Sequence, residues 1–217
     1  MFIYEVKKSE IVRYLGYRRG FTPDETIYGM IDECLEDMKK AVTPREIHKC
    51  FRILRDDGVR IGEMKIEEGN LTKNLAGCEE AVLMAVTLGP EPDRLVRRAE
   101  LGNMNKAFIY QAIGAAMTEV WCDEVNIKVR KESAERGLYT RPRFSPGYGD
   151  FPLEHQKDFA RILNMTREIG VTLSDSLLMI PSKSVTAVIG LSTTEDNCRL
   201  EGCEVCSRHG SCAFSRI

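Results

Sequence analysis

The run Ala81-Val-Leu-Met-Ala-Val-Thr-Leu88, which is followed by Gly89-Pro90, decides the fold class of this chain. It is almost continuously apolar and eight residues long, and it ends at two residues that interrupt regular secondary structure. A run of this length with such a boundary favours a buried strand over a buried helix. The sequence therefore predicts a buried strand here.

Helical patterns lie on both sides of this strand. Thr22-Pro23-Asp24-Glu25 is typical of a helix start, with a capping hydroxyl, a proline in the first turn and acidic residues at the positive end of the dipole. The apolar residues that follow recur at intervals of three and four, which predicts one buried face. Residues 92 to about 136 form one long helical pattern. Pro152 opens a further helix, which Gly170 is expected to end.

Shorter β-like stretches complete the pattern. Residues 59–66 alternate imperfectly, and two apolar runs at 177–180 and 185–191 flank Pro181-Ser-Lys-Ser184, which we interpret as a hairpin. Strands and helices without a regular βαβ repeat predict an α+β fold, with a mixed or antiparallel sheet packed against helices. Apolar periodicity stops at Thr193. We therefore expect a domain at 1–192 and a cysteine-rich tail at 193–217.

Composition excludes several classes of protein. The 217 residues are 43% hydrophobic and 29% charged, as in ordinary globular proteins, and the net charge of −2 argues against a general nucleic-acid binder. No apolar run approaches the roughly 18–20 residues of a membrane span. The N-terminus lacks the order of charged and apolar regions found in a signal peptide. We therefore expect a cytoplasmic protein with no nucleic-acid or membrane partner.

The stretch Arg141-Pro-Arg143-Phe-Ser-Pro146-Gly147-Tyr148-Gly-Asp-Phe-Pro152 is the least regular part of the domain. Prolines and glycines fix its backbone, and a rigid loop on a packed scaffold is well suited to hold a ligand. An arginine here can bind a carboxylate with two parallel hydrogen bonds, and a tyrosine can offer its ring to a cation. Composition alone also allows an ordinary solvated turn.

This loop carries a resemblance to a known family. Arg143-Phe-Ser-Pro-Gly147-Tyr148, followed by Pro152-Leu-Glu-His155, resembles the signature of the activation (reactivation) domain of cobalamin-dependent methionine synthase. Three further motifs resemble that family in the same order. They are Arg13-Tyr-Leu-Gly-Tyr17, Ala85-Val-Thr-Leu-Gly89 and Leu178-Met-Ile-Pro-Ser-Lys-Ser-Val185. The resemblance covers roughly residues 3–191.

The resemblance implies a function and a set of partners. In this family the domain binds S-adenosylmethionine over the cobalamin domain, where one electron and the donor's methyl regenerate methylcobalamin from cob(II)alamin. It implies ligand-binding roles for Arg143, Pro146, Gly147 and Tyr148 only. Arg141, the other arginine of the loop, is an additional candidate, and we assign no catalytic residue. The implied partners are a methionine synthase that lacks its own activation domain and a flavodoxin or ferredoxin as the electron donor. We expect an accessory component that acts in trans rather than a complete methionine-forming enzyme.

The match has departures. The family's longer enzymes often have Pro and Cys where this chain has Gly149 and Phe151. They also use acidic residues outside the loop, for which Glu119, Asp123 and Glu124 are candidates. His155 matches the histidine of the motif, and we interpret it as a structural residue that caps or packs the following helix.

Eight cysteines are distributed unevenly along the chain. Cys34, Cys50, Cys78 and Cys122 are expected to be buried free thiols. Four others lie within 15 residues of the tail and form a candidate metal site: Cys198, Cys203, Cys206 and Cys212. Thiolates suit either an iron–sulfur cluster or zinc, and the spacing does not choose between these or exclude an unmetallated tail.

Other functions therefore remain open at this point. The client could be another corrinoid methyltransferase. The chain could also be an iron–sulfur electron-transfer protein, or an interaction module stapled by zinc, without S-adenosylmethionine binding. Binding of S-adenosylmethionine would distinguish the two reactivation functions, on methionine synthase or on another corrinoid methyltransferase, from the electron-transfer and interaction functions.

Overall fold

The computed structural model describes residues 2–18, 20–56 and 58–195 of the chain. The helices are α1 (Lys8–Tyr14), α2 (Glu25–Ala41), α3 (Asn70–Asn74), α4 (Glu91–Glu100), α5 (Met104–Ala134), the 3-10 helix η1 (Leu153–His155), α6 (Gln156–Leu163) and α7 (Met165–Ile169). The strands are β1 (Arg45–Leu54), β2 (Val59–Ile61), β3 (Met64–Ile66), β4 (Cys78–Thr87), β5 (Tyr139–Thr140), β6 (Thr172–Leu173), β7 (Met179–Ile180) and β8 (Ser184–Ser192).

Six of these strands form one antiparallel sheet in the order β3-β2-β1-β4-β8-β5. β4 and β8 occupy its centre, and nearly all of their residues are buried. The apolar run at 81–88 coincides with most of β4, which confirms the predicted buried strand. The α+β prediction is likewise confirmed, with a sheet that is wholly antiparallel.

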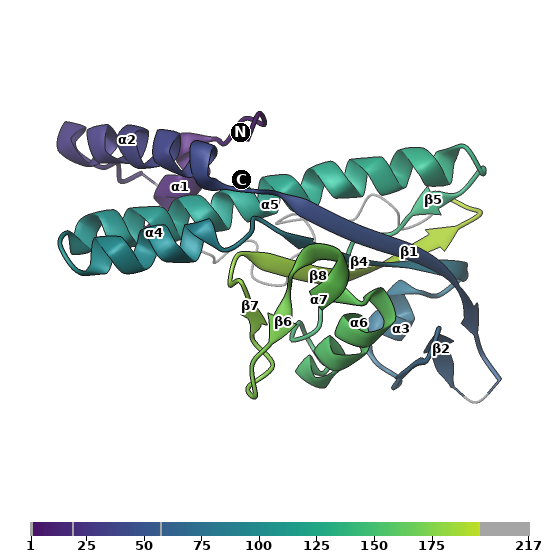
Figure 1. Ribbon diagram of the computed structural model, residues 1–217. Coiled ribbons are helices and arrows are strands. Elements are labelled where there is room, and N and C mark those ends of the chain that lie inside the picture. Colours follow the sequence, from purple (N-terminus) through teal and green to yellow (C-terminus); the bar gives the residue numbers. More distant parts are fainter. Residues whose placement is uncertain (1, 19, 57, 196–217) are drawn as a thin grey trace.

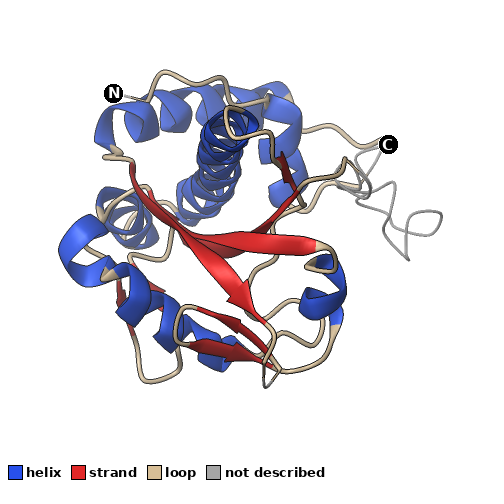
Figure 2. Cartoon of the chain, turned by 90° about the vertical axis from the view of Figure 1, so that its right-hand side faces the viewer, coloured by secondary structure: helices blue, strands red, loops and turns tan. Residues whose placement is uncertain are grey.

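Helices cover both faces of the sheet (Figures 1 and 2). Alternate residues of β4 point to opposite faces, as the period of a strand requires. Val82, Met84 and Val86 pack against α5, and α1, α2 and α4 form a further core cluster with α5. Ala81, Leu83 and other residues of the opposite face pack with α3, α6 and α7. The long helix α5 therefore lies between the sheet and the helices α1, α2 and α4.

The hairpin predicted around Pro181-Ser-Lys-Ser184 is wrong. β7 pairs with β6 in a separate two-stranded sheet, whereas β8 pairs with β4 and β5. Ser182 donates from its backbone N and its Oγ to the Asp93 carboxylate of α4, at 2.8 and 2.5 Å. The Nζ of Lys183 donates to Gln111 of α5. These contacts hold the turn against α4 and α5, and the strands on its two sides, β7 and β8, pair with different strands.

Several helix boundaries also differ from the prediction. The long pattern at 92–136 contains two helices, because Asn103 accepts a hydrogen bond from Lys106 N at 3.1 Å and so caps the start of α5. α2 is capped by Asp24, which accepts from Ile27 N at 2.9 Å, and not by Thr22. The helix expected from Pro152 to Gly170 is broken at Asn164, whose backbone is left-handed.

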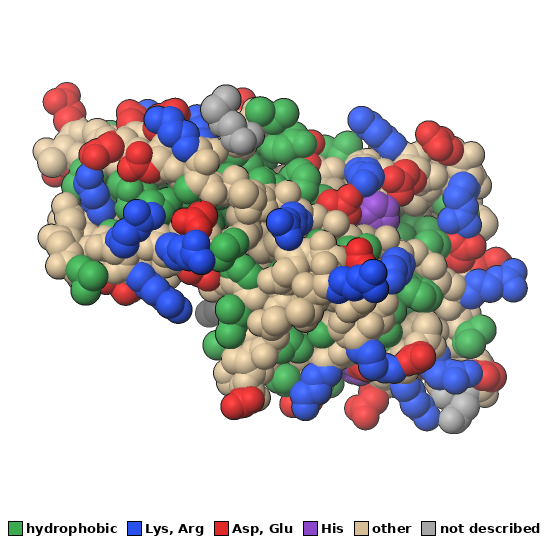
Figure 3. All heavy atoms as spheres, viewed as in Figure 1, with side chains coloured by type: hydrophobic (Ala, Val, Ile, Leu, Met, Phe, Trp, Pro, Cys, Tyr) green, Lys and Arg blue, Asp and Glu red, His purple; other side chains and the backbone are tan. Residues whose placement is uncertain are grey.

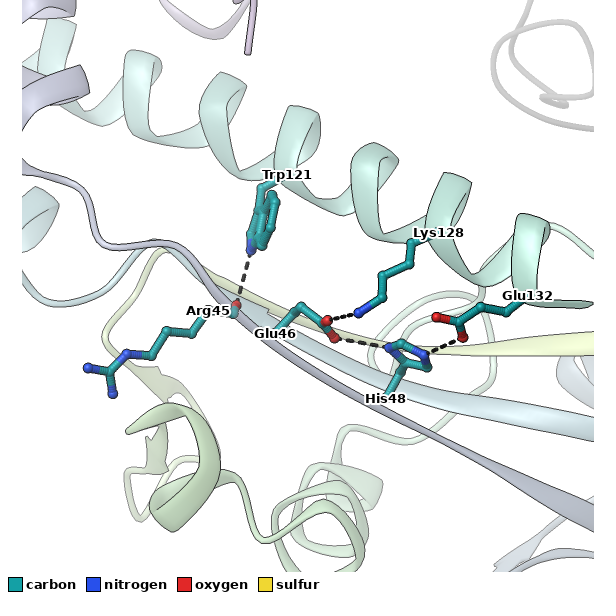
Figure 4. Close-up of polar contacts among 6 residues, drawn as sticks. All are labelled: Arg45, Glu46, His48, Trp121, Lys128 and Glu132. Carbon is teal, nitrogen blue, oxygen red and sulfur yellow. Dashed lines mark hydrogen bonds and ion pairs between the residues drawn. The ribbon is translucent and has the colours of Figure 1, made fainter. Parts of the chain in front are cut away.

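A polar network ties β1 to α5 (Figure 4). His48 lies between two carboxylates, with Nδ1 3.0 Å from Glu46 and Nε2 2.9 Å from Glu132. The other oxygen of Glu46 accepts from Lys128 Nζ at 2.6 Å, and Trp121 Nε1 donates to the Arg45 carbonyl at 3.0 Å. The network therefore joins β1 of the sheet to the side chains of α5 above it.

On the face drawn in Figure 3, acidic and basic side chains are interspersed, as the small net charge leads us to expect. None of the described helices has both the length and the apolar character needed to cross a bilayer. The thiols of Cys34, Cys78 and Cys122 are free and buried, as predicted. Cys50 is free but exposed, because it lies on the polar face of β1, where its thiol donates to Glu80.

Candidate functional site

The irregular loop between β5 and η1 is fixed to the sheet at its start. Phe144 forms an isolated antiparallel bridge with Val188 of β8, with N–O distances of 2.9 and 2.8 Å. A turn follows, in which Tyr148 N donates to the Ser145 carbonyl at 3.2 Å. Gly147 sits in this turn with φ +89°, a backbone conformation that side chains disfavour. The loop therefore leaves the central sheet in a defined direction.

Arg143 is bound by two acidic side chains of α5. Its Nη1 donates to Asp123 at 2.6 Å and its Nη2 donates to Glu119 at 2.8 Å. These acids lie four residues apart and so stand on one face of the helix. Burial opposes the charge of the guanidinium, but the hydrogen bond to Asp123 and the neighbouring acidic groups raise the pKa of Arg143. Arg143 is therefore a charged group held in a fixed orientation.

A cavity of ≈ 440 Å³ opens beside Arg143. Its wall combines loop residues with side chains from α5, α6, β7 and β8. The lining residues are Glu119, Arg143, Phe144, Ser145, Pro146, Tyr148, Gln156, Met179, Val185 and Thr186. A cavity of this size is within the range of roughly 300–1,000 Å³ typical of small-molecule sites.

The floor and the mouth of this cavity differ in character. Gln156 and Thr186 are buried, and Thr186 Oγ1 donates to Gln156 Oε1 at 2.9 Å. The Tyr148 side chain, by contrast, is 69% exposed. The cavity thus has a buried, hydrogen-bonded polar pair in its wall and an exposed aromatic residue at its edge.

A second hollow of ≈ 370 Å³ adjoins the first across Glu119, which lines both. Its other walls are the segment around α1, including Glu5 and Glu10, and further residues of α5, including Asp123. Most residues that line the two hollows are uncharged, but the acidic ones outnumber the basic ones, with Glu5, Glu10, Glu119 and Asp123 against Lys7 and Arg143. A positively charged ligand would therefore meet a favourable field in this part of the molecule.

The structure brings together three of the five predicted ligand residues. Arg143, Pro146 and Tyr148 line the cavity, whereas Gly147 shapes the turn and is absent from the described lining. Arg141 lies elsewhere. Its side chain is 5% exposed, passes close to Gly190 and donates to the Ala76 carbonyl at 3.1 Å. Arg141 directly follows β5, and its backbone N still donates to the Gly190 carbonyl of β8 at 2.8 Å. Its side chain therefore packs beside the sheet, before the chain reaches the cavity.

The three acidic candidates also separate. Glu119 and Asp123 pair with Arg143, but Glu124 lines a different hollow beside Trp121. His155 stacks on Phe151 with ring centroids 4.8 Å apart, and its Nδ1 lies 2.9 Å from Asp158, an arrangement that favours the structural interpretation. Sequence reasoning missed Gln156, Met179 and Thr186. Met179 lies in the Leu178–Val185 motif that carries the resemblance, whereas Gln156 and Thr186 gave no signal beyond their polarity.

The candidate metal ligands Cys198, Cys203, Cys206 and Cys212 lie outside the described residues. Within the described ranges, no group of three His, Cys, Asp or Glu side chains has an arrangement that could hold a metal ion.

Comparison with known families identifies the class of the domain. Residues 82–199, more than half of the chain, match the profile described as "Vitamin B12 dependent methionine synthase, activation domain". The chain belongs to this family. The match includes the Arg143–Tyr148 loop and the whole of strands β5 and β8. It begins within β4, at residue 82.

The fold of this activation-domain member also resembles a solved structure, the crystal structure of the MetH reactivation domain bound to AdoHcy. The TM-score is 0.61 at 18% sequence identity, and the alignment covers 76% of this chain. It spans 64% of the solved domain, so somewhat more than a third of that domain has no counterpart in the alignment. At this identity the likeness shows the fold. No curated protein sequence matches the chain.

Proposed function

We propose that the chain binds S-adenosylmethionine in the cavity beside Arg143 and supports reductive remethylation of cob(II)alamin on a methionine synthase acting in trans. Membership of the activation-domain family supports this proposal. The observation that carries it is the pairing of Arg143 with Glu119 at the wall of a cavity of suitable size.

The charges at this wall match the amino-acid end of the proposed ligand. That end carries a carboxylate and an ammonium group on one carbon atom. Arg143 can bind the carboxylate while Glu119 binds the ammonium, so both charges of the protein pair are satisfied again when the ligand replaces their mutual contact. A plain carboxylate would leave Glu119 without a cation, so the pair favours a zwitterion.

The remainder of the ligand has chemically suitable surroundings. The sulfonium carries a positive charge, and the exposed ring of Tyr148 at the cavity edge can stabilise such a cation. The acidic hollow that shares Glu119 gives the same charge a favourable field. S-adenosylmethionine supplies the methyl group, while the protein residues bind and orient it, because methyl transfer to reduced cobalt depends on positioning.

The cavity edge also offers a surface for a protein partner. Met179 lines the cavity, and its neighbours Leu178 and Ile180 are 63% and 54% exposed. With Tyr148 they place apolar surface next to the proposed donor site, where a cobalamin-bearing partner would have to approach. Such a contact must release again for turnover, so we expect a weak complex that is tighter in the cob(II)alamin state.

Calorimetry with S-adenosylmethionine tests the ligand, and a reactivation assay with separately supplied cob(II)alamin-loaded synthase and a reductant tests the function. Arg143→Ala should weaken binding by about tenfold to a hundredfold, since charge-assisted hydrogen bonds contribute about 1.5–3 kcal/mol. Arg97→Ala, at an exposed arginine of α4, is the matched control and should bind normally. Wild-type protein that binds no S-adenosylmethionine, or Arg143→Ala that binds equally well, would contradict the proposal.

We further propose that residues 193–217 form a separate metal-binding tail, with Cys198, Cys203, Cys206 and Cys212 as the ligands. The end of β8 at Ser192 and the chemistry of four closely spaced thiols support this division. An iron–sulfur cluster would allow the tail to relay an electron from a ferredoxin or flavodoxin. Metal analysis and absorption spectra of anaerobically purified protein test this. A colourless protein with zinc alone would exclude the relay.

A further inference from the structure

The far end of the ligand loop is held by a contact that the proposed function does not use. Asp150 follows Tyr148 by two residues, and both oxygens of its carboxylate accept from the backbone N–H of Asn70, at 2.9 and 3.1 Å. Asn70 is the first residue of α3, which lies 80 residues earlier in the chain. The contact therefore joins the loop to a distant element.

The carboxylate lies so close to Gly69 that a side chain at this position would displace it. A Cβ atom on Gly69 would lie 2.8 Å from Oδ2 and 3.0 Å from Oδ1 of Asp150. The φ of Gly69 is 174°, an extended conformation that any residue adopts, so the need for glycine comes from space and not from the backbone. An alanine at this position would have to push the carboxylate away from Asn70 N.

The α3 side of the contact is firmly packed. Leu71, the next residue of α3, is 2% exposed and belongs to the same core cluster as Phe151, the residue that follows Asp150. Gly149 also approaches α3 closely, since a Cβ there would lie 3.0 Å from Asn70 Nδ2. Two neighbouring loop residues thus meet the same turn of a packed helix.

Without this contact the loop would have considerable freedom. Gly147 and Gly149 both have positive φ, at 89° and 56°, and glycine allows many alternative conformations. The other hydrogen bonds that the turn makes within the described part of the chain are local, such as Gly147 N to the Phe151 carbonyl at 2.8 Å. Arg143 is fixed through α5, but Tyr148 lies on the side of the turn nearer to Asp150.

We infer that Asp150 is a positioning residue, which holds Pro146 and Tyr148 in place at the cavity by binding the backbone N–H of Asn70. This inference rests on the proposed function for its ligand, but the anchoring itself is a property of the loop. Asp150 touches neither cavity in the described structure, so its effect on the ligand passes through the loop.

Hydrogen exchange of the 144–151 segment and calorimetry with S-adenosylmethionine test the inference together. Asp150→Ala should speed exchange in this segment about tenfold and weaken ligand binding by a similar factor, as expected for loss of a charge-assisted hydrogen bond. Asp150→Asn retains an acceptor oxygen and should restore both values to within about twofold of wild type. Asp175→Ala, at an exposed aspartate of another loop, is the control and should change neither.

Gly69→Ala provides an independent test of the same contact. Alone it should reproduce the effects of Asp150→Ala, and in the Asp150→Ala background it should add nothing, because the obstructed carboxylate is then absent. Additive effects of the two substitutions, or unchanged exchange in Asp150→Ala, would overturn the inference. If the wild type binds no S-adenosylmethionine, the proposed function fails, while the exchange pattern still decides whether Asp150 anchors the loop.

Discussion

Replacing Glu46 by glutamine should destabilise the fold through the network between β1 and α5. The substitution keeps the size of the side chain but removes the charge that faces both His48 and Lys128. The hydrogen bond from His48, which outweighs the opposing effect of burial, and the bond from Lys128 lower the pKa of Glu46 from 4.5 to about 2. The carboxylate is therefore much more stable in the folded protein than in the unfolded chain.

The structure sets the size of the effect. A pKa difference of about 2.5 corresponds to about 3.4 kcal/mol, at roughly 1.36 kcal/mol per pKa unit. The Glu46 side chain is only 19% exposed, but its partner Lys128 and the second acid on His48, Glu132, are each 52% exposed. Solvent screening at those partners reduces the expected loss for Glu46→Gln to about 2 kcal/mol.

The dependence on pH has a definite sign at each end. The folded-state pKa of Glu46 is lowered, so its contribution is present above pH 4.5 and is lost as the pH falls toward about 2. The hydrogen bond to Glu46 and, less strongly, that to Glu132 raise the pKa of His48 above 6.5 despite burial. The His48 contribution is therefore complete below pH 6.5 and is lost as the pH rises through the raised value. Both contributions are present between pH 4.5 and 6.5.

Urea denaturation followed by tryptophan fluorescence is the appropriate assay, because Trp121 is the single tryptophan of the chain and donates to β1 within this network. At pH 5.5, Glu46→Gln should lose about 2 kcal/mol, and its stability should fall less steeply than that of wild type below pH 4.5. Glu36→Gln, which breaks an exposed pair with Lys39 on α2, should cost less than about 0.5 kcal/mol. Equal losses in the two variants, or parallel acid limbs for Glu46→Gln and wild type, would refute the reasoning.

Two further substitutions have predictable results. Gly114→Ala places a methyl group 2.6 Å from Lys183 Cε, so Lys183 must move into solvent, and the lowered pKa that burial gives it should rise toward its ordinary value. The pH dependence of amine labelling at Lys183 measures this change, and an unaltered profile would contradict it. Phe151→Ala removes a buried ring beneath the ligand loop and should cost about 3–5 kcal/mol in urea denaturation. Phe151→Leu should cost less than about 1.5 kcal/mol, and similar losses for both would argue against close packing at this position.

Local patterns in the sequence predicted the parts of the fold that depend on local periodicity. The spacing of Ile31, Cys34, Leu35 and Met38 correctly indicated the buried face of α2, because a helix repeats its neighbours every three or four residues. The uninterrupted apolar run likewise indicated β4, since a central strand is buried on both faces. Local patterns did not predict which strands pair with each other. Residues around 177–191 had the composition of a hairpin, but β8 instead pairs with β4, where Ser184 bonds to Thr87 across 97 positions.

In the candidate site, too, local sequence indicated the loop residues but not their distant partners. The resemblance and the loop chemistry indicated Arg143, Pro146 and Tyr148, which the structure places together at one cavity. The sequence alone could not show which acid meets Arg143, because Glu119 and Asp123 are 24 and 20 residues away and their contact depends on how α5 crosses the sheet. Arg141 and Arg143 have similar local sequence, yet they separate because their places relative to β5 and β8 differ.

The placement of side chains around α5 explains why stability and ligand binding should respond separately to mutation. Successive residues of an α-helix are rotated by roughly 100°, so the buried residues Cys122 and Val129 of α5 face the sheet together. Glu119 and Asp123 flank this buried face on one side, and Trp121, Lys128 and Glu132 flank it on the other. Among the described residues, the first group binds Arg143 and the second binds β1. Because the sheet fixes the rotation of α5, each group is held in place without the other, and substitutions at Glu46 and Arg143 should have additive effects on the free energy of unfolding.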